Sequence, residues 1–283
     1  MGQDNFLRNL THDGLHTPVI KRHPLEKIRL HNYYAGVFST AMKNTWPQRA
    51  YLGLYSGGGR ARLADTNEIV ETTPMSVLRI RDPFTKYVFV DNNQSCVRAL
   101  EQRVATLSAG PDATCICADV NSSLPQIQEA MPAFSRQRGL LSFCFVDPFS
   151  ADLDFRVIKT LGRKYRMDFL ILLMLGLDIR INFRRYLEDP GNDRIGALID
   201  CPHWRTEWAA SGRPHRQPIR FLLDKFDQAM RGLGYDAGTP QSIRVTGKGA
   251  LLYFLVFYSR NPLGVKFWED ARRRVSIQMT LGL

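Results

Sequence analysis

The sequence predicts an α/β protein built on a doubly wound, mostly parallel sheet. Through the first two thirds of the chain, short apolar segments that suit buried strands alternate with amphipathic segments that suit helices, which is typical of βαβ crossovers. Near the C-terminus this rhythm ends in two apolar runs joined by Thr246-Gly247-Lys248-Gly249, a turn that suits an antiparallel hairpin. Five parallel strands and the hairpin together make a sheet of seven strands.

The elements follow from the spacing of apolar residues. The expected strands are 50–55, 87–90, 114–118, 141–146 and 168–175, followed by the hairpin strands 242–245 and 251–258. Helical spacing predicts helices over 24–41, 97–107, 124–131 and 155–161, and another is expected to begin near 74–80. The polar segment 65–73 is expected to be a loop.

One large domain accounts for most of the chain. With 283 residues it is long enough to bury a full core, and residues 18–283 are expected to form it. The polar residues 1–17 are expected to be a flexible lead-in. Between the fifth strand and the hairpin, at about 178–235, we expect a basic and mostly helical insertion.

Composition narrows the class of partner and compartment. Thirty-eight Lys and Arg against 27 Asp and Glu give a net charge of +11, which favours a polyanionic partner such as nucleic acid. There is no apolar run long enough to span a membrane, and the N-terminal segment lacks the apolar core of a secretion signal. Five cysteines argue against a disulfide scaffold and indicate the cytoplasm, and their spacing fits no zinc site.

Candidate binding residues gather where the predicted strands end, which is where ligands bind in doubly wound sheets. The first strand runs into Ser56-Gly57-Gly58-Gly59, and bare glycine backbone lets a ligand approach closely. The next three strands end in Asp91, Asp119 and Asp147. A cofactor with an adenosine end and an amino-acid end, such as S-adenosylmethionine (SAM), suits this set. The glycine turn lacks both the lysine of a phosphate loop and the G-x-G-x-x-G pattern.

Each strand-end residue has an expected role. Asp91 is expected to accept the ribose hydroxyls and Asp119 to lie near the adenine. The full set of expected cofactor contacts is Tyr55, Ser56, Gly57, Gly59, Asp91, Asn92 and Asp119. Asp147, Pro148 and Phe149 are expected to border the transferred methyl group as catalytic residues. The alternative is that each acidic residue simply caps a helix or forms a turn.

In their order along the chain, the motifs between about residues 27 and 268 resemble those of the three-Cys-motif partner (TcmP) proteins. Tyr55-Ser56-Gly57-Gly58-Gly59-Arg60 is similar to the Phe-Ala-Gly-Pro-Gly-Arg turn of that family, and Thr73-Pro74-Met75 to its Gly-Ser-Pro-Leu. Further similar segments are 89–92, 145–149 and 251–257, continuing to 266–268. The resemblance implies a Rossmann-like, class I methyltransferase-like fold, whose seven strands have the layout described above. It also implies a bacterial gene setting linked to mobile elements or defence, and an iron–sulphur, radical-SAM-like partner with a three-cysteine motif.

One departure from the motifs of that family bears on the choice between two candidate functions. Gly53 stands where the family has an acidic residue, and Leu54 replaces the glycine after it. Methyltransferases use that carboxylate to organise the amino-acid end of the cofactor. Gly53 therefore favours a non-catalytic module that binds nucleic acid or the three-cysteine partner, whereas the intact Asp91, Asp119 and Asp147 favour a SAM-dependent methyltransferase acting on nucleic acid or a modified base. Nucleic-acid cleavage by carboxylates and a metal is disfavoured because the acidic residues are scattered.

Two structures are open for the insertion. In the first, its tryptophans stack on bases and its arginines grip phosphates. The expected phosphate contacts are Arg184, Arg185, Arg205, Arg213, Arg216 and Arg220. In the second, the insertion is a solvated helical lid whose arginines cap helix ends and whose tryptophans pack on the sheet.

Overall fold

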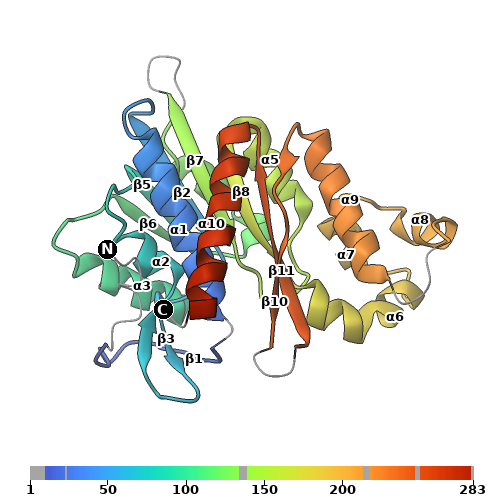
Figure 1. Cartoon of the computed structure of the whole chain (residues 1–283), viewed down its shortest axis with the longest axis horizontal. Coiled ribbons are helices and arrows are strands. Elements are labelled where there is room, and N and C mark those ends of the chain that lie inside the picture. The colour runs from blue at the N-terminus through green and yellow to red at the C-terminus, as the bar shows by residue number, and fades with distance from the viewer. Residues whose placement is uncertain (1–9, 23, 134–138, 213–216, 246–248, 282–283) are drawn as a thin grey trace.

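The computed structural model describes residues 10–22, 24–133, 139–212, 217–245 and 249–281, and a central eight-stranded sheet organises them (Figure 1). Along the sheet the strands are β10 (Gln241–Arg244), β11 (Leu251–Ser259), β8 (Arg166–Leu173), β7 (Leu140–Val146), β2 (Gln48–Leu54), β5 (Lys86–Asp91) and β6 (Ala113–Cys117), and β9 (Asp236–Ala237) pairs with β11. The five strands from β8 to β6 are parallel, and β11 runs antiparallel to both β8 and β10. The predicted fold class is confirmed, with one short extra strand.

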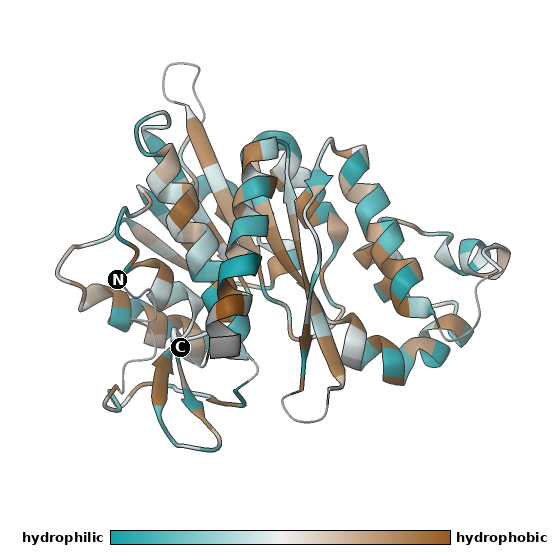
Figure 2. Cartoon of the chain, in the orientation of Figure 1, coloured by the Kyte–Doolittle hydropathy of each residue, from teal (hydrophilic) through white to brown (hydrophobic). Residues whose placement is uncertain are grey.

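Helices cover both faces of the sheet because successive strand residues point to opposite sides. On one face, Tyr51 and Phe89 pack with α1 (Pro24–Met42), α2 (Thr73–Val77), α3 (Gln94–Ala105) and α10 (Pro262–Leu281). On the other, Leu52 and Val88 pack with α4 (Leu124–Ala130) and α5 (Phe155–Lys164). Figure 2 shows the apolar colouring concentrated on the central strands.

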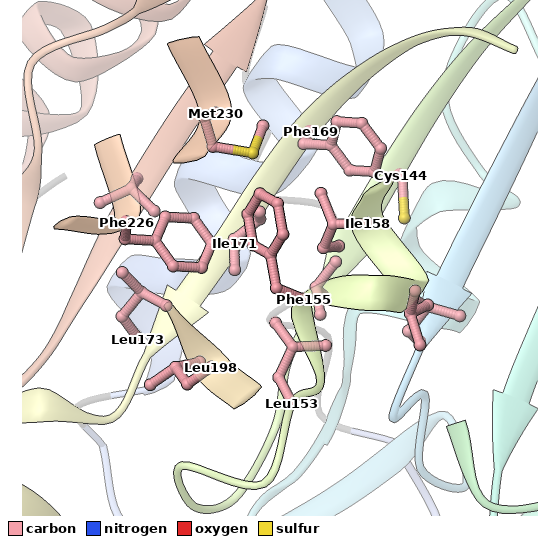
Figure 3. Packing of buried hydrophobic residues seen from close by; sticks show 14 of the residues in the cluster. Cys144, Leu153, Phe155, Ile158, Phe169, Ile171, Leu173, Leu198, Phe226 and Met230 are labelled. Carbon is pink, nitrogen blue, oxygen red and sulfur yellow. The ribbon is translucent and has the colours of Figure 1, made fainter. Parts of the chain in front are cut away.

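The core on the α4 and α5 face of the sheet continues into the insertion. Figure 3 shows Phe155 and Ile158 of α5 against Phe169 and Ile171 of β8, with Phe226 from the insertion closing the same cluster. The insertion is helical as predicted: a π-helix (Leu175–Ile179), α6 (Arg180–Glu188), α7 (Arg194–Leu198), α8 (Trp204–Ala210) and α9 (Pro218–Gly232). It is thus continuous with the domain core.

The tryptophans of the insertion are core residues. Trp204 and Trp208 are 0% and 5% exposed, and both rings pack against Phe183. The expectation that they stack on bases is therefore wrong, because their faces are already covered. The alternative of a helical lid with buried tryptophans holds, but the rings contact Phe183 of α6 and Phe221 of α9, which are other helices of the insertion.

Three further features differ from the sequence expectations. The segment 65–73, expected to be a loop, contains the strand β4 (Ile69–Glu71), which forms a hairpin with β3 (Arg60–Leu63). The two-residue strand β1 (Val19–Ile20) pairs with β3. The long C-terminal α10 was not expected at all. Residues 10–17 of the expected lead-in are packed against the domain, while 1–9 lie outside the described residues. Among the described helices, none has the length and apolar composition needed to cross a membrane.

Candidate functional site

The glycine turn has a backbone that few residues tolerate. Tyr55, Gly57 and Gly59 have φ angles of 60°, 67° and 85°, in the left-handed region. At Gly59 a Cβ would lie 2.5 Å from Cγ of Met75, whereas at Gly57 it would meet nothing within 4 Å. The turn is therefore closed against α2 at Gly59 and open at Gly57, where a ligand has room. Tyr55 adopts this conformation without being glycine, which indicates local strain at the strand end.

Asp91 fastens the glycine turn to the end of the neighbouring strand. One carboxylate oxygen accepts the Gly57 N–H at 2.8 Å and the other accepts the Asn93 N–H at 2.9 Å. The residue is 6% exposed. A carboxylate has about four acceptor positions, so two positions stay available for ribose hydroxyls. Asn92 beside it is exposed, and its carbonyl accepts a weak bond from the Cys117 thiol.

Asp119 has the structural role that the sequence left open as an alternative. Its side chain accepts the Asn121 N–H at 2.8 Å and caps the short 3-10 helix Val120–Ser122. Asp119 is exposed at the end of β6, next to β5 in the sheet. It therefore borders the same edge as Asp91 while already holding its own turn.

Gly53 is closely surrounded, so a side chain at this position would have to displace its neighbours. A Cβ there would be 2.8 Å from Oγ of Ser56 and 3.2 Å from the rings of Phe89 and Tyr51. The Ser56 hydroxyl donates to the Gly53 carbonyl at 2.8 Å. The position that carries a carboxylate in the resembling family is thus filled by Ser56 and two aromatic rings.

Asp147 is paired with a lysine that the sequence analysis did not assign to the site. Lys27 Nζ lies 2.5 Å from Asp147 Oδ2, and the two side chains are 13% and 18% exposed. The Asp147 N–H bonds the Leu54 carbonyl at 3.2 Å, so the pair lies beside the glycine turn. Pro148 is buried, whereas Phe149 is 85% exposed. Nothing in the spacing of residues 27 and 147 marks this contact, because α1 brings Lys27 there through tertiary packing.

A buried polar cluster lies under this pair. His31 bonds Asn32 through Nδ1 and the Tyr51 hydroxyl through Nε2, each at 2.9 Å, and burial lowers the pKa of His31 to about 3. The Tyr253 hydroxyl is buried and has no hydrogen-bond partner among the described residues. Burial, with the Asp147 and Glu26 carboxylates, raises the pKa of Tyr253. His31 is therefore neutral beneath the charged Lys27.

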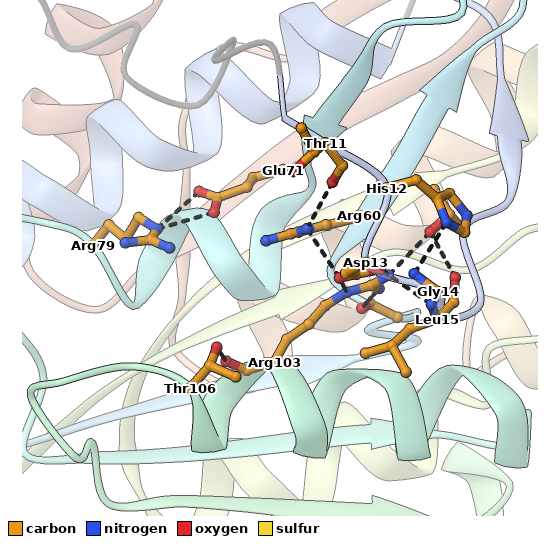
Figure 4. Close-up of polar contacts among 12 residues, drawn as sticks. Thr11, His12, Asp13, Gly14, Leu15, Arg60, Glu71, Arg79, Arg103 and Thr106 are labelled. Carbon is orange, nitrogen blue, oxygen red and sulfur yellow. Dashed lines mark hydrogen bonds and ion pairs between the residues drawn. The ribbon is translucent and has the colours of Figure 1, made fainter.

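The N-terminal segment braces the glycine turn from behind (Figure 4). Arg103 of α3 is 2% exposed, donates to the Gly58 carbonyl, and binds both carboxylate oxygens of Asp13 at 2.8 and 3.0 Å. Arg60 lies 2.9 Å from the same carboxylate. The hydrogen bond from Arg103 holds the pKa of Asp13 well below its usual range. The sequence analysis missed this brace, and no motif signals it.

The arginines of the insertion are in several different settings. Arg205 donates to the carbonyls of Tyr186, Asp189 and Asn192 at the end of α6, so it caps a helix as the lid alternative predicts. The exposed Arg184 and Arg220 pair with Glu188 and Asp224 one turn away. Arg185 is exposed, and Arg213 and Arg216 lie outside the described residues.

Most of the net charge lies outside the insertion. Residues 178–235 hold ten Lys and Arg against eight Asp and Glu, a net of +2, whereas 236–283 hold seven against three, a net of +4. The insertion is therefore only weakly basic. Two contacts join the insertion to the loop after Phe149. The Asp178 carboxylate, in the π-helix Leu175–Ile179, accepts the Ala151 N–H at 3.2 Å, and Arg194 at the start of α7 pairs with Asp152 at 2.9 Å.

The strand order and the antiparallel β11 define a class I methyltransferase-like fold. No protein-family model matches the chain, and no curated protein matches it. Among solved structures it is similar to a protein of Legionella pneumophila, with 9% identity over 90% of this chain and 91% of that chain and a TM-score of 0.49. It is also similar to the O-methyltransferase TomG of Streptomyces achromogenes in complex with SAM, with 11% identity, 85% and 90% covered, and a TM-score of 0.46. A third is an O-methyltransferase of Bacillus cereus in complex with SAH, with 11% identity, 90% and 85% covered, and a TM-score of 0.45.

Proposed function

We propose that this protein binds SAM across the carboxyl ends of β2, β5 and β6 and methylates a nucleic acid at an amino group of a base. The observation that carries the proposal is the placement of Asp91. It fastens the glycine turn, is almost fully buried, and keeps two acceptor positions for a ribose. The open space over Gly57 gives the ligand room beside that carboxylate. The residues of the site therefore fit the cofactor.

Asp147 and Phe149 suit the acceptor side of the reaction. When bound, SAM supplies a methyl group on a positively charged sulphur. Asp147 keeps one carboxylate oxygen beyond the one paired with Lys27, and this oxygen can accept a hydrogen bond from an amino group and orient its lone pair. Phe149, 85% exposed on the same turn, offers a ring face on which a base can stack.

Nucleic acid as substrate is supported by charge and by α6. The net charge of +11 favours a polyanion. Arg180, Arg184 and Arg185 are exposed along α6, and Asp178 in the π-helix just before α6 is hydrogen-bonded to the loop that follows Phe149. A strand bound along α6 would pass beside Phe149, so these arginines are proposed as phosphate contacts.

A transfer assay with labelled SAM and mixed RNA or DNA tests this function. Phe149→Ala is expected to lower kcat/KM for nucleic acid about 10- to 100-fold, because stacking on an aromatic ring is worth about 1–3 kcal/mol per base. Its affinity for SAM is expected to stay within about twofold of the wild type, since Phe149 lies on the acceptor side. Ile277→Ala on α10, which removes another exposed apolar side chain away from the proposed nucleic-acid surface, is the matched control. Label transfer that is equal in the Phe149 variant and the wild type would count against the acceptor site proposed here.

A second candidate is a non-catalytic module that works with another protein. Gly53 favours it, because the position of the family carboxylate is filled by other side chains. The resemblance to three-Cys-motif partner proteins adds an iron–sulphur, radical-SAM-like protein as the proposed partner. Calorimetric titration separates the candidates: a folded sample that binds neither SAM nor its demethylated product at millimolar concentration supports the module.

A further inference from the structure

The sheet order fixes where the amino-acid end of a bound cofactor must lie, if the proposed function holds. With the ribose at Asp91 on β5 and the adenine toward β6, the rest of the molecule crosses β2 toward β7. Neighbouring strands are about 4.8 Å apart, so β7 lies about 10 Å from β5. The residue at the end of β7 is Asp147, which is paired with Lys27.

The strand β2, which ends beside the glycine turn, carries no carboxylate for that end of the cofactor. Methyltransferases use a carboxylate at the position of Gly53, and here Ser56 Oγ would lie 2.8 Å from any Cβ at that position. The other basic side chains near the turn are engaged elsewhere. His31 has both ring nitrogens bonded, and Arg103 is bound to Asp13 and Gly58 on the far side of the turn.

Lys27 has the chemistry that this end requires. It lies in the first turn of the 19-residue α1, where the helix dipole favours a bound anion. Its ammonium has three donors, and Asp147 engages one of them.

We propose that Lys27 binds the α-carboxylate of the cofactor, so that α1 rather than β2 holds its amino-acid end. The site would then select ligands by their carboxylate. A charge-assisted hydrogen bond is worth about 1.5–3 kcal/mol, which corresponds to about a 10- to 100-fold difference in affinity.

Calorimetric titration with three ligands tests the assignment: S-adenosylhomocysteine, its decarboxylated analogue, and 5′-methylthioadenosine, which lacks the whole amino-acid end. The wild type is expected to bind S-adenosylhomocysteine about 10- to 100-fold more tightly than the decarboxylated analogue. Lys27→Met is expected to bring this ratio close to 1, and Lys27→Arg to restore part of it. Lys43→Met is the matched control, because Lys43 follows the C-terminal end of the same helix and pairs with Asp82 at 2.9 Å. It is expected to keep the wild-type ratio.

The outcomes separate this inference from the proposed function. Because Lys27→Met leaves the Asp147 carboxylate without its lysine, Lys27→Met/Asp147→Asn is measured beside it, with thermal unfolding to check that both are folded. A folded Lys27→Met protein that keeps the wild-type ratio overturns the role of Lys27 while leaving cofactor binding intact. Binding of none of the three ligands by folded wild type overturns the proposed function and this inference together.

Discussion

Adding one methyl group at Gly53 tests whether the missing strand carboxylate is a matter of space. In Gly53→Ala the new Cβ would lie 2.8 Å from Ser56 Oγ and 3.2 Å from two aromatic rings. Displacing Ser56 removes its hydrogen bond to the Gly53 carbonyl, worth about 1 kcal/mol, and overpacking against the rings adds about 1–3 kcal/mol. The gain from replacing a strand glycine offsets about 0.5–1 kcal/mol. We expect a net loss of about 1–3 kcal/mol in the free energy of unfolding.

A double-mutant cycle with Ser56→Ala isolates the steric contact. Removing Oγ also removes the shortest contact, so Gly53→Ala/Ser56→Ala is expected to lose about 1 kcal/mol less than the sum of the single variants. Urea unfolding followed by circular dichroism measures each value. Gly36→Ala on α1 is the control, since its Cβ would meet nothing within 4 Å and should stabilise the helix by about 1 kcal/mol. Additivity of the two changes to within about 0.5 kcal/mol would refute the steric account.

Three further predictions concern the turn, its brace and a buried carboxyl. Gly59→Ala is expected to lower the free energy of unfolding by about 3 kcal/mol or more, and Gly57→Ala by about 1–2 kcal/mol. Both residues have a positive φ, but only at Gly59 would the new Cβ also overlap Met75. Equal losses in the two variants would contradict this. Arg103→Met is expected to cost about 1.5–3 kcal/mol at pH 7, because it removes the charge-assisted hydrogen bonds to Asp13 and Gly58 while Asp13 keeps its pair with Arg60. The variant should also lose less of its free energy of unfolding than the wild type as the pH falls below 4, because the depressed pKa of Asp13 stabilises the wild-type fold above that pH. Urea titrations that show the same decrease below pH 4 in both proteins would contradict this. Burial raises the pKa of Asp168 from 3.8 to about 6. The free energy of unfolding of the wild type should therefore fall by up to about 3 kcal/mol as the pH rises from about 4 to about 6. In Asp168→Asn, which keeps an acceptor for Tyr34, this pH dependence should disappear.

The sequence predicted the parallel sheet because its strands are buried on both faces. Segments such as Leu140–Val146 read as unbroken apolar runs and end in a polar residue, so both the strand and its carboxyl end could be recognised. The hairpin β3–β4 escaped prediction because its first strand alternates arginine with apolar residues next to the glycine turn. Its pattern is short, and the burial that gives it meaning comes from neighbouring elements.

The site was predictable where it depends on strand ends and not where it depends on tertiary packing. Glycines and acidic residues after strands pointed to one edge of the sheet, and the structure places Gly57, Asp91 and Asp147 there. Lys27 and Arg103 lie on helices at positions that look like ordinary surface charges in the sequence. Conversely, Trp204, Trp208 and Arg205 read as a nucleic-acid surface, because a sequence does not show which aromatic rings are covered.

The most direct measurement of the central claim is calorimetric titration of SAM against wild type and Asp91→Asn. The isosteric change keeps one acceptor for the glycine turn and removes the carboxylate charge that we propose binds the ribose hydroxyls. We expect micromolar binding by wild type and at least about tenfold weaker binding by the variant, with both proteins folded by circular dichroism. Equal affinity in the two proteins, or no binding by folded wild type at millimolar SAM, would contradict a cofactor site at the ends of β2 and β5.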